Sequence, residues 1–239
     1  MKSWQKILIP TAFTLLIGAI YLFSVWKQRQ DPGVVAQSSA QKLSADDLAV
    51  VRELFPAHFE DTIQLEGSTV WMKNGYTISY FPATFSRIDF AHPAGVLPSI
   101  QRLEIKKILK SAVPASLDDG VGHGSQQVFA VFALPGQSRL FALPIGVIDG
   151  DDEAYYCDVL FFYDDPHTIY DNWSKDTWAA IDAHQVKPGM SELQTRLAIG
   201  QNMHPSSSQQ GNRTIAFNQA SKHWTVTFVD NRATTIQGL

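Results

Sequence analysis

Three apolar runs follow one another in the middle of the chain: Gln126–Leu134 (QQVFAVFAL), Arg139–Ile148 (RLFALPIGVI) and Ala154–Tyr163 (AYYCDVLFFY). They are rich in β-branched and aromatic residues, which favour strands, and short polar stretches separate them. These runs predict three consecutive antiparallel strands. Pro144 lies inside the middle run and cannot donate a hydrogen bond to a neighbouring strand, so we expect either an edge strand or a bulge at this position.

The residues before these runs predict a mixture of helices and short strands. We expect helices from Ser44 to Pro56 and at Leu97–Leu109, because apolar residues recur there at helical spacing. The segments that favour strands are Thr62–Leu65, Thr69–Met72 and Tyr76–Phe81, with a tight turn at Lys73–Gly75 between the last two. Together with the central runs they predict an α+β domain over residues 43–168.

Capping signals define the elements of the C-terminal part. Ser174 can cap a helix through Ile181, and Ser191 forms a capping box with Gln194 for a second helix, which Gly200 ends. Three strand candidates follow, the last two joined by a turn at Asp230-Asn231: Thr214–Phe217, Trp224–Phe228 and Thr234–Ile236. The predicted domain over residues 169–239 is therefore helix, helix, strand, strand, strand.

The second of these strands alternates between apolar residues and threonines. Because side chains in a strand point to opposite faces in turn, Trp224, Val226 and Phe228 should lie on one face. We expect this face to be buried against the helix that carries Leu193 and Leu197. If Trp224 is instead exposed, it becomes a candidate partner-binding anchor, since tryptophan is enriched at interface hot spots.

The stretch Ile7–Trp26 (ILIPTAFTLLIGAIYLFSVW) contains no charged residue. Twenty residues in a helix span roughly 30 Å, the thickness of a bilayer core, so the stretch predicts a transmembrane helix. A cleaved signal peptide is the alternative, but no small-x-small cleavage site follows directly. We therefore expect an uncleaved signal anchor over residues 1–27, followed by a polar tether over residues 28–42.

The charges that flank this helix leave its orientation nearly balanced. Lys2 and Lys6 precede it, and Lys27, Arg29 and Lys42 follow it. The short N-terminal tail resembles the start of export signals, so we expect the N-terminus in the cytoplasm. The bulk of the chain is then periplasmic or otherwise extracytoplasmic, held at the inner (plasma) membrane.

Composition excludes some functional classes. The chain has 239 residues, a net charge of -4 and no run of lysine and arginine, which argues against nucleic-acid binding. The only cysteine, Cys157, cannot form an internal disulfide, and its apolar neighbours indicate a small buried side chain rather than a nucleophile.

No motif for a cofactor or a metal is present in the sequence. The seven histidines lack metal-ligand spacing, and neither a phosphate loop nor a dinucleotide fingerprint occurs. The acidic segment Asp149–Glu153 favours a solvated hairpin tip over a calcium loop. His123 lies in a glycine-rich loop near Asp118 and Ser125, and these three residues are weak candidates for a catalytic base and its partners.

One segment of the C-terminal part carries a family resemblance. The residues VKPGMSELQ (Val186–Gln194), followed by Leu197, Gly200 and HWTVTF (His223–Phe228), resemble the SmpA/OmlA (BamE) type of small envelope domain. The resemblance covers roughly residues 173–239 and implies a non-catalytic module that helps to assemble outer-membrane proteins. The chain departs from the family in two ways: it lacks the lipid-bearing cysteine, and Gly200 is not followed by proline.

The sequence thus predicts an N-terminal transmembrane helix followed by two α+β blocks, each with a mainly antiparallel sheet packed against helices. The leading functional hypothesis is a non-enzymatic envelope protein with a C-terminal domain that docks a protein partner. The alternatives are a membrane-tethered hydrolase that uses the His123 loop, or a protein that binds a lipid or another small ligand between the two blocks. A ligand binder of this kind requires a deep apolar cavity.

Overall fold

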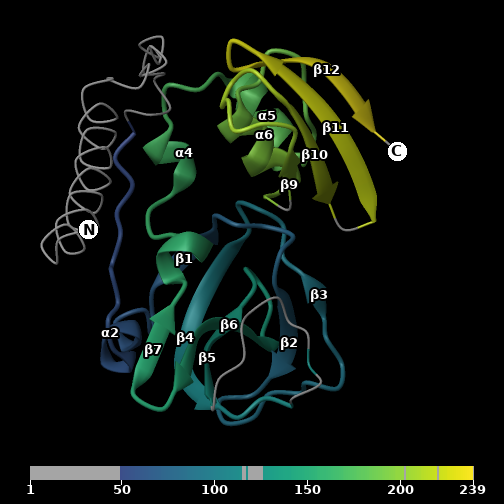
Figure 1. Cartoon of the computed structure of the whole chain (residues 1–239). Coiled ribbons are helices and arrows are strands. Elements are labelled where there is room, and N and C mark those ends of the chain that lie inside the picture. Colours follow the sequence, from purple (N-terminus) through teal and green to yellow (C-terminus); the bar gives the residue numbers. More distant parts are fainter. Residues whose placement is uncertain (1–48, 115–116, 118–125, 202, 220, 239) are drawn as a thin grey trace, which may run out of the picture. The chain divides into compact units, whose positions relative to one another are not determined.

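The computed structural model of the protein describes residues 49–114, 117, 126–201, 203–219 and 221–238 (Figure 1). All of them belong to one compact unit. The predicted membrane anchor, Ile7–Trp26, and the tether lie outside the described residues, as do the catalytic candidates Asp118, His123 and Ser125. Within the described ranges, no helix is long and apolar enough to cross a membrane.

A large antiparallel sheet occupies the first half of the described chain, and it curls strongly along its length (Figure 1). Its strand order is β3-β2-β6-β5-β4-β1-β8, and β7 pairs with the C-terminal end of β6. The strands are β1 Thr69–Met72, β2 Ser79–Ala83, β3 Gly95–Val96, β4 Arg102–Ser111, β5 Gln126–Ala133, β6 Leu140–Asp149, β7 Asp152–Tyr155 and β8 Phe161–Phe162.

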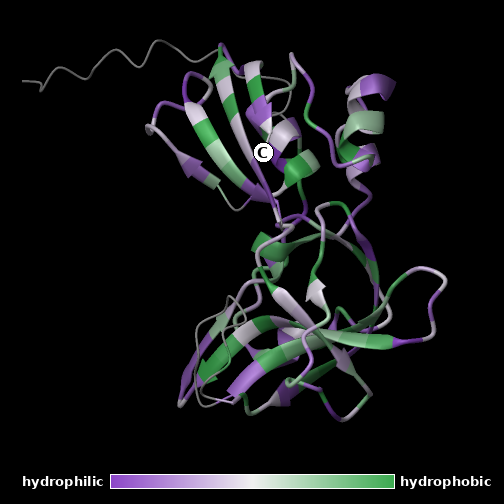
Figure 2. Ribbon diagram, turned by 90° about the vertical axis from the view of Figure 1, so that its right-hand side faces the viewer, coloured by the Kyte–Doolittle hydropathy of each residue, from purple (hydrophilic) through white to green (hydrophobic). Residues whose placement is uncertain are grey.

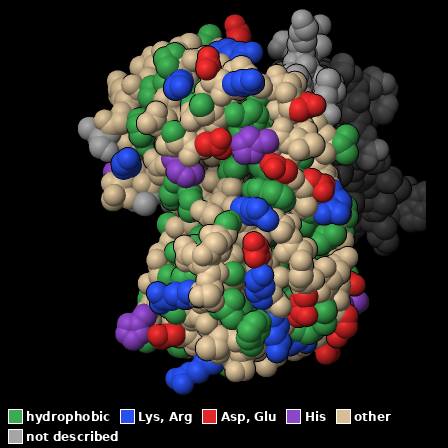
Figure 3. Space-filling model, turned by 180° about the vertical axis from the view of Figure 1, so that it is seen from behind, with side chains coloured by type: hydrophobic (Ala, Val, Ile, Leu, Met, Phe, Trp, Pro, Cys, Tyr) green, Lys and Arg blue, Asp and Glu red, His purple; other side chains and the backbone are tan. Residues whose placement is uncertain are grey.

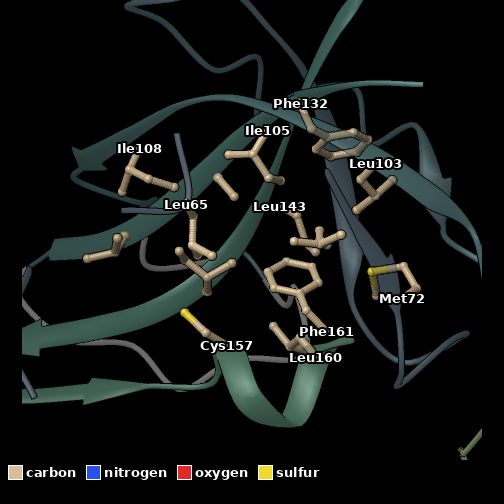
Figure 4. Close-up of a cluster of buried hydrophobic side chains, with 14 of the residues drawn as sticks. Leu65, Met72, Leu103, Ile105, Ile108, Phe132, Leu143, Cys157, Leu160 and Phe161 are labelled. Atoms are coloured by element: carbon tan, nitrogen blue, oxygen red, sulfur yellow. The ribbon is translucent and has the colours of Figure 1, made fainter. Parts of the chain in front are cut away.

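Strand β5 lies at the centre of this sheet and is buried on both faces. Val128 and Phe132 face the main hydrophobic cluster, and Phe129 and Val131 face a second cluster on the other side. A strand buried on both faces needs apolar residues at every position, which is why the run VFAVFA is continuous. Figure 4 shows the main cluster, into which Cys157 and the other labelled side chains point.

The bulge expected at Pro144 is present. Val128 pairs with Gly146 while Phe129 pairs with Pro144, so Ile145 is an extra residue in β6. The carbonyl of Ile145 accepts a hydrogen bond from the backbone N–H of Tyr156 at 2.8 Å. Strand β6 lies between β2 and β5, so the alternative of an edge strand is wrong.

A second, smaller antiparallel sheet and two helices form the C-terminal part. Its strand order is β12-β11-β10-β9. The elements are α5 Lys175–Asp182, α6 Glu192–Ile199, β9 Met203–Pro205, β10 Thr214–Gln219, β11 Lys222–Val229 and β12 Arg232–Gly238. Figure 2 shows hydrophobic and hydrophilic segments alternating along these strands near the C label, as expected for a sheet with one buried face.

The predicted capping signals of both helices are confirmed. Ser174 accepts a hydrogen bond from the N–H of Thr177, and Ser191 exchanges reciprocal bonds with Gln194. Gly200 ends α6 with a φ of 100°, a value that a residue with a side chain rarely adopts. Strand β9 is an addition that the sequence analysis did not predict.

A buried ion pair fastens the loop before β10 to helix α6. Glu192 is 2% exposed, and its carboxylate accepts bonds from Arg213 at 2.7 and 3.1 Å and from the N–H of Gly211 at 2.6 Å. The side chain of Asn231 joins this network, because its Oδ1 atom accepts a hydrogen bond from the backbone N–H of Glu192. This network holds irregular backbone that lies outside the named strands.

The segment of residues 49–58, here called the strap, is not helical in the structure, so the described part of the predicted Ser44–Pro56 helix is wrong. The backbone N–H groups of Leu54 and Phe55 donate to the carboxylate of Asp158 at 2.8 and 2.9 Å. The hydroxyl of Tyr163 donates to the same carboxylate at 2.8 Å. A distant side chain thus satisfies the backbone that a helix would have satisfied internally.

The predicted helix at Leu97–Leu109 is also wrong, because this segment contains β4. Leu103, Ile105 and Ile108 are its buried residues, and the register of β4 against β5 shifts between Ile105 and Lys107. This bulge lengthens the spacing of buried residues from two to three. A spacing of three is also found in helices, which explains the misreading.

Three further predictions for the large sheet fail. Thr62–Leu65 is not a strand, since it contains the end of helix α2, Phe59–Ile63. The turn at Lys73–Gly75 joins no hairpin, because β1 pairs with β4 and β8 while β2 pairs with β3 and β6. The run Ala154–Tyr163 divides into β7, the short helix α3 (Cys157–Leu160) and β8.

The predicted fold class is therefore contradicted. In the described part of the chain, the helices α2 and α3 that accompany the large sheet are only five and four residues long. This half of the protein is mostly antiparallel sheet, and it is not an α+β block. The transmembrane helix of the predicted fold lies outside the described residues.

The acidic hairpin tip was predicted correctly, except for its last residue. Asp149, Asp151 and Asp152 are exposed at the turn between β6 and β7. Glu153 instead accepts bonds from the N–H of Phe59 at 2.9 Å and from the hydroxyl of Tyr155 at 2.6 Å. The bond from Tyr155 lowers the pKa of Glu153.

Cys157 should be chemically inert. It is fully buried, and burial raises the pKa of its thiol to about 12, so the reactive thiolate is absent at neutral pH.

We expect no alkylation of the native protein by iodoacetamide at pH 8, and full alkylation after denaturation. Cys157→Ala should leave function intact and lower the free energy of unfolding by about 1 kcal/mol, as a small core truncation does. Loss of function with an unchanged fold would contradict this.

Candidate functional site

An open groove with a volume of about 610 Å³ lies where the small sheet, the α5–α6 loop and the loop after β1 meet. Its lining combines aromatic rings with amide, hydroxyl and ammonium groups: Tyr76, Ala183, His184, Gln185, Val186, Gln219, Ser221, Lys222 and Trp224. We call this site the Trp224 groove.

Trp224 lies at the rim of the C-terminal hydrophobic core. Val226 and Phe228 of the same strand are at most 1% exposed, and they pack in one cluster with Leu197. Trp224 belongs to the edge of this cluster but is only partly buried. The prediction of a buried face is therefore confirmed for Val226 and Phe228. The ring of Trp224 is only partly buried, because one part contacts the core and another part lines the groove.

Two neighbours determine how the indole ring of Trp224 lies. Its Nε1–H donates to the side-chain oxygen of Gln219 at 3.0 Å. Gly238 pairs with Trp224 across β11 and β12, and a Cβ atom at Gly238 would come within 2.8 Å of the ring. The ring thus lies directly on the backbone of β12, and a side chain at Gly238 would displace it.

Tyr76 enters the groove from the large sheet with a strained backbone. Its φ of 62° is rare for an aromatic residue, and its N–H donates to the carbonyl of Leu97 at 2.7 Å. A Cβ atom at Gly200 would come within 2.7 Å of the Tyr76 ring, so the ring packs directly on the end of α6. Burial raises the pKa of Tyr76, so its hydroxyl stays protonated.

His184 follows the end of α5 and also has a positive φ, of 53°. Its ring meets Tyr76 edge to face, with 6.1 Å between the ring centroids. The Nδ1 atom is buried and has no hydrogen-bond partner among the described residues. A buried polar atom without a partner is uncommon, and this one belongs to a residue that lines the groove.

Gln219 links the three aromatic residues of the groove. Its side-chain nitrogen donates to the hydroxyl of Tyr76 at 3.2 Å and to the carbonyl of His184 at 3.5 Å, and its oxygen accepts from Trp224. Gln219 is 6% exposed, so these bonds replace those it would make to water. The amide therefore holds the aromatic wall of the groove in one arrangement.

The described lining of the groove offers several kinds of contact to a ligand. Among the described residues of the lining, Lys222 is the only charged one, and none carries a carboxylate. A general base or an activated nucleophile needs a partner within hydrogen-bond reach, and the described lining offers no carboxylate to His184 or Ser221. The aromatic faces and polar groups provide contact area and hydrogen bonds for a ligand.

A group of polar and aromatic side chains around His167 has a structural role. The Nδ1 atom of His167 lies 3.0 Å from Asp165 and its Nε2 atom 3.3 Å from Asp182, while its ring stacks on Trp178. These contacts join α4 (Pro166–Ile169) to α5. No group of residues suited to a metal ion occurs among those that the structure describes. Figure 3 shows acidic and basic side chains interspersed on one face of the molecule.

The sequence identified only one residue of the groove. Trp224 was a candidate because of the alternation in β11, but no pattern pointed to Tyr76, His184 or Gln219. Asn74-Gly75 indicates a turn before Tyr76, which gives no direction for its ring. Gln219 lies 143 residues from Tyr76 in the sequence, and only the folded chain brings them together.

Substitutions along β11 should separate core positions from the groove. We expect Phe228→Ala to lower the free energy of unfolding by about 3 to 5 kcal/mol, the usual loss for a large buried aromatic. Trp224→Ala should cost about half as much, because its ring is only partly buried, and Thr225→Ala on the other face should cost less than about 1 kcal/mol. Thermal and denaturant unfolding of the three variants measures this order. Equal costs for Trp224→Ala and Phe228→Ala would place Trp224 in the core and remove it from the site.

No protein family, curated protein or solved structure matches the chain.

Proposed function

We propose that the protein is a membrane-anchored extracytoplasmic docking protein without catalytic activity. Ile7–Trp26 anchors it in the inner membrane, and its C-terminal part acts as an SmpA/OmlA-like domain in assembly or maintenance of the cell envelope. The Trp224 groove is the site that receives a partner polypeptide.

The observation that carries this proposal is the partial exposure of Trp224 in a prearranged groove. A tryptophan that only filled the core would be buried like Phe228. Instead its ring is fixed by Gln219 beside the rings of Tyr76 and His184. Rigid aromatic side chains at a partly polar site are typical of interface anchors, because little conformational entropy is lost when a partner binds.

The alternatives have less support. The hydrolase hypothesis depends on His123, Asp118 and Ser125, which lie outside the described residues. The hypothesis of a lipid binder requires a deep apolar cavity, whereas the Trp224 groove is open and its lining is mixed. A polypeptide, which presents both backbone amides and side chains, matches this lining better.

The orientation of the chain can be tested with topology reporters. We expect alkaline phosphatase fused after Leu239 to be active, because this enzyme folds only after export. A fluorescent protein that matures only in the cytosol should stay dark at the same position. The reverse pattern would contradict the extracytoplasmic assignment.

Docking at the groove can be tested by photocrosslinking in intact cells. We expect a photoreactive phenylalanine at Lys222 to form a crosslink to one protein, and we expect Trp224→Ala in the same chain to abolish this crosslink. The control is the same probe at Lys107, an exposed residue of β4 remote from the groove lining. A crosslink that persists in the Trp224→Ala variant would show that the groove is not the docking site.

A further inference from the structure

Strand β12 is an edge of the small sheet, and its outer side is only partly occupied. At its start, the N–H of Ala233 donates to the carbonyl of Met190 and its carbonyl accepts from the N–H of Gly189, both at 2.8 Å. These bonds show that the backbone groups of Ala233 point away from β11. Beyond Ala233, the outer side of residues 234–238 has no backbone partner among the described residues.

This free edge lacks the devices that usually protect an edge strand. Natural proteins discourage pairing with proline, bulges or inward-pointing charges on the edge. Residues 234–238 read TTIQG and contain neither proline nor a charged residue. The one bulge of β12 lies next to Thr234, at the end already covered by Gly189 and Met190. Among the described residues, none pairs with this stretch of extended backbone, so a further strand fits beside it.

The far end of the free edge leads into the Trp224 groove. Gly238 is exposed, and the indole ring of Trp224 lies on it because glycine has no side chain. A strand placed beside β12 would set one of its side chains next to this ring, on the same face of the sheet. Backbone hydrogen bonds along the edge and one side chain in a pocket are the two components of recognition by strand addition.

The charges near the edge of β12 indicate which kind of partner segment binds there. Arg232 in β12 and Lys222 in the groove lining are basic residues near the two ends of this edge, although the whole chain has a net charge of -4. A second copy of β12 in antiparallel pairing would bring its own Arg232 toward the Lys222 end, so two positive charges would meet. An acidic segment would instead meet both charges favourably.

We propose that an extended, acidic segment of a partner polypeptide pairs with residues 234–238 as a fifth strand of the small sheet and places one side chain against Trp224. The inference rests on the proposed docking function and specifies its partner. The segment hydrogen-bonds to the edge of β12, and its carboxylates face Lys222 and Arg232.

The test is a selection from a randomised ten-residue peptide library against the full chain in lipid nanodiscs. We expect the enriched peptides to be acidic and to slow amide hydrogen exchange in residues 234–238. Lys222→Glu should weaken the best peptide about tenfold, because it replaces an attraction with a repulsion. The matched control is Lys175→Glu at the exposed start of α5, which should leave affinity unchanged.

N-methylation of alternate backbone amides in the best peptide distinguishes strand addition from docking through side chains alone. One of the two alternating patterns should abolish binding, since it removes the hydrogen bonds to β12. If both methylated peptides bind as before, strand addition is wrong, while docking at the groove stands if the Lys222 crosslink is present. Enrichment of basic peptides, or of none, would also overturn the proposal.

Discussion

The ring of Tyr76 packs on the backbone of Gly200, and the arrangement of the two sheets around the groove depends on this contact. The approach is so close that no side chain fits at Gly200. The same residue ends α6, so one glycine serves both helix termination and packing. Gln201, the next residue, donates hydrogen bonds to the carbonyls of Lys73 and Gly75 and so joins the same two segments. The positive φ of Tyr76 is tolerated because these surroundings fix it.

Carboxylates hold the irregular parts of the chain in place. Asp158 accepts two backbone N–H groups of the strap, Glu192 accepts the N–H of Gly211 together with Arg213, and Glu153 accepts the N–H of Phe59. Each of these backbone groups lies outside a sheet ladder and would otherwise need water. These three carboxylates thus have structural partners, and none of them belongs to the described lining of the Trp224 groove.

The Trp224 groove has features of a binding surface. Its described lining offers aromatic faces and a positive charge, and an edge strand lies beside it. The strap contacts the main cluster of the large sheet through Leu54 and the C-terminal cluster through Val51. In the proposed arrangement, the segment that follows the membrane tether is therefore packed into the same unit that carries the docking site.

The sequence by itself determined those elements whose signals are local. The capping box at Ser191, the cap at Ser174, the strands β1, β5 and β6 and the alternation of Val226 and Phe228 depend on neighbours within a few residues. Only the tertiary structure decided the elements in which a local signal competes with a distant partner. The bulge in β4 gave helical spacing to a strand, and Asp158 took the place of helical bonds in the strap. The groove arose in the same way, because Tyr76, His184 and Gln219 are far apart in sequence and meet only through long-range packing, which no local pattern encodes.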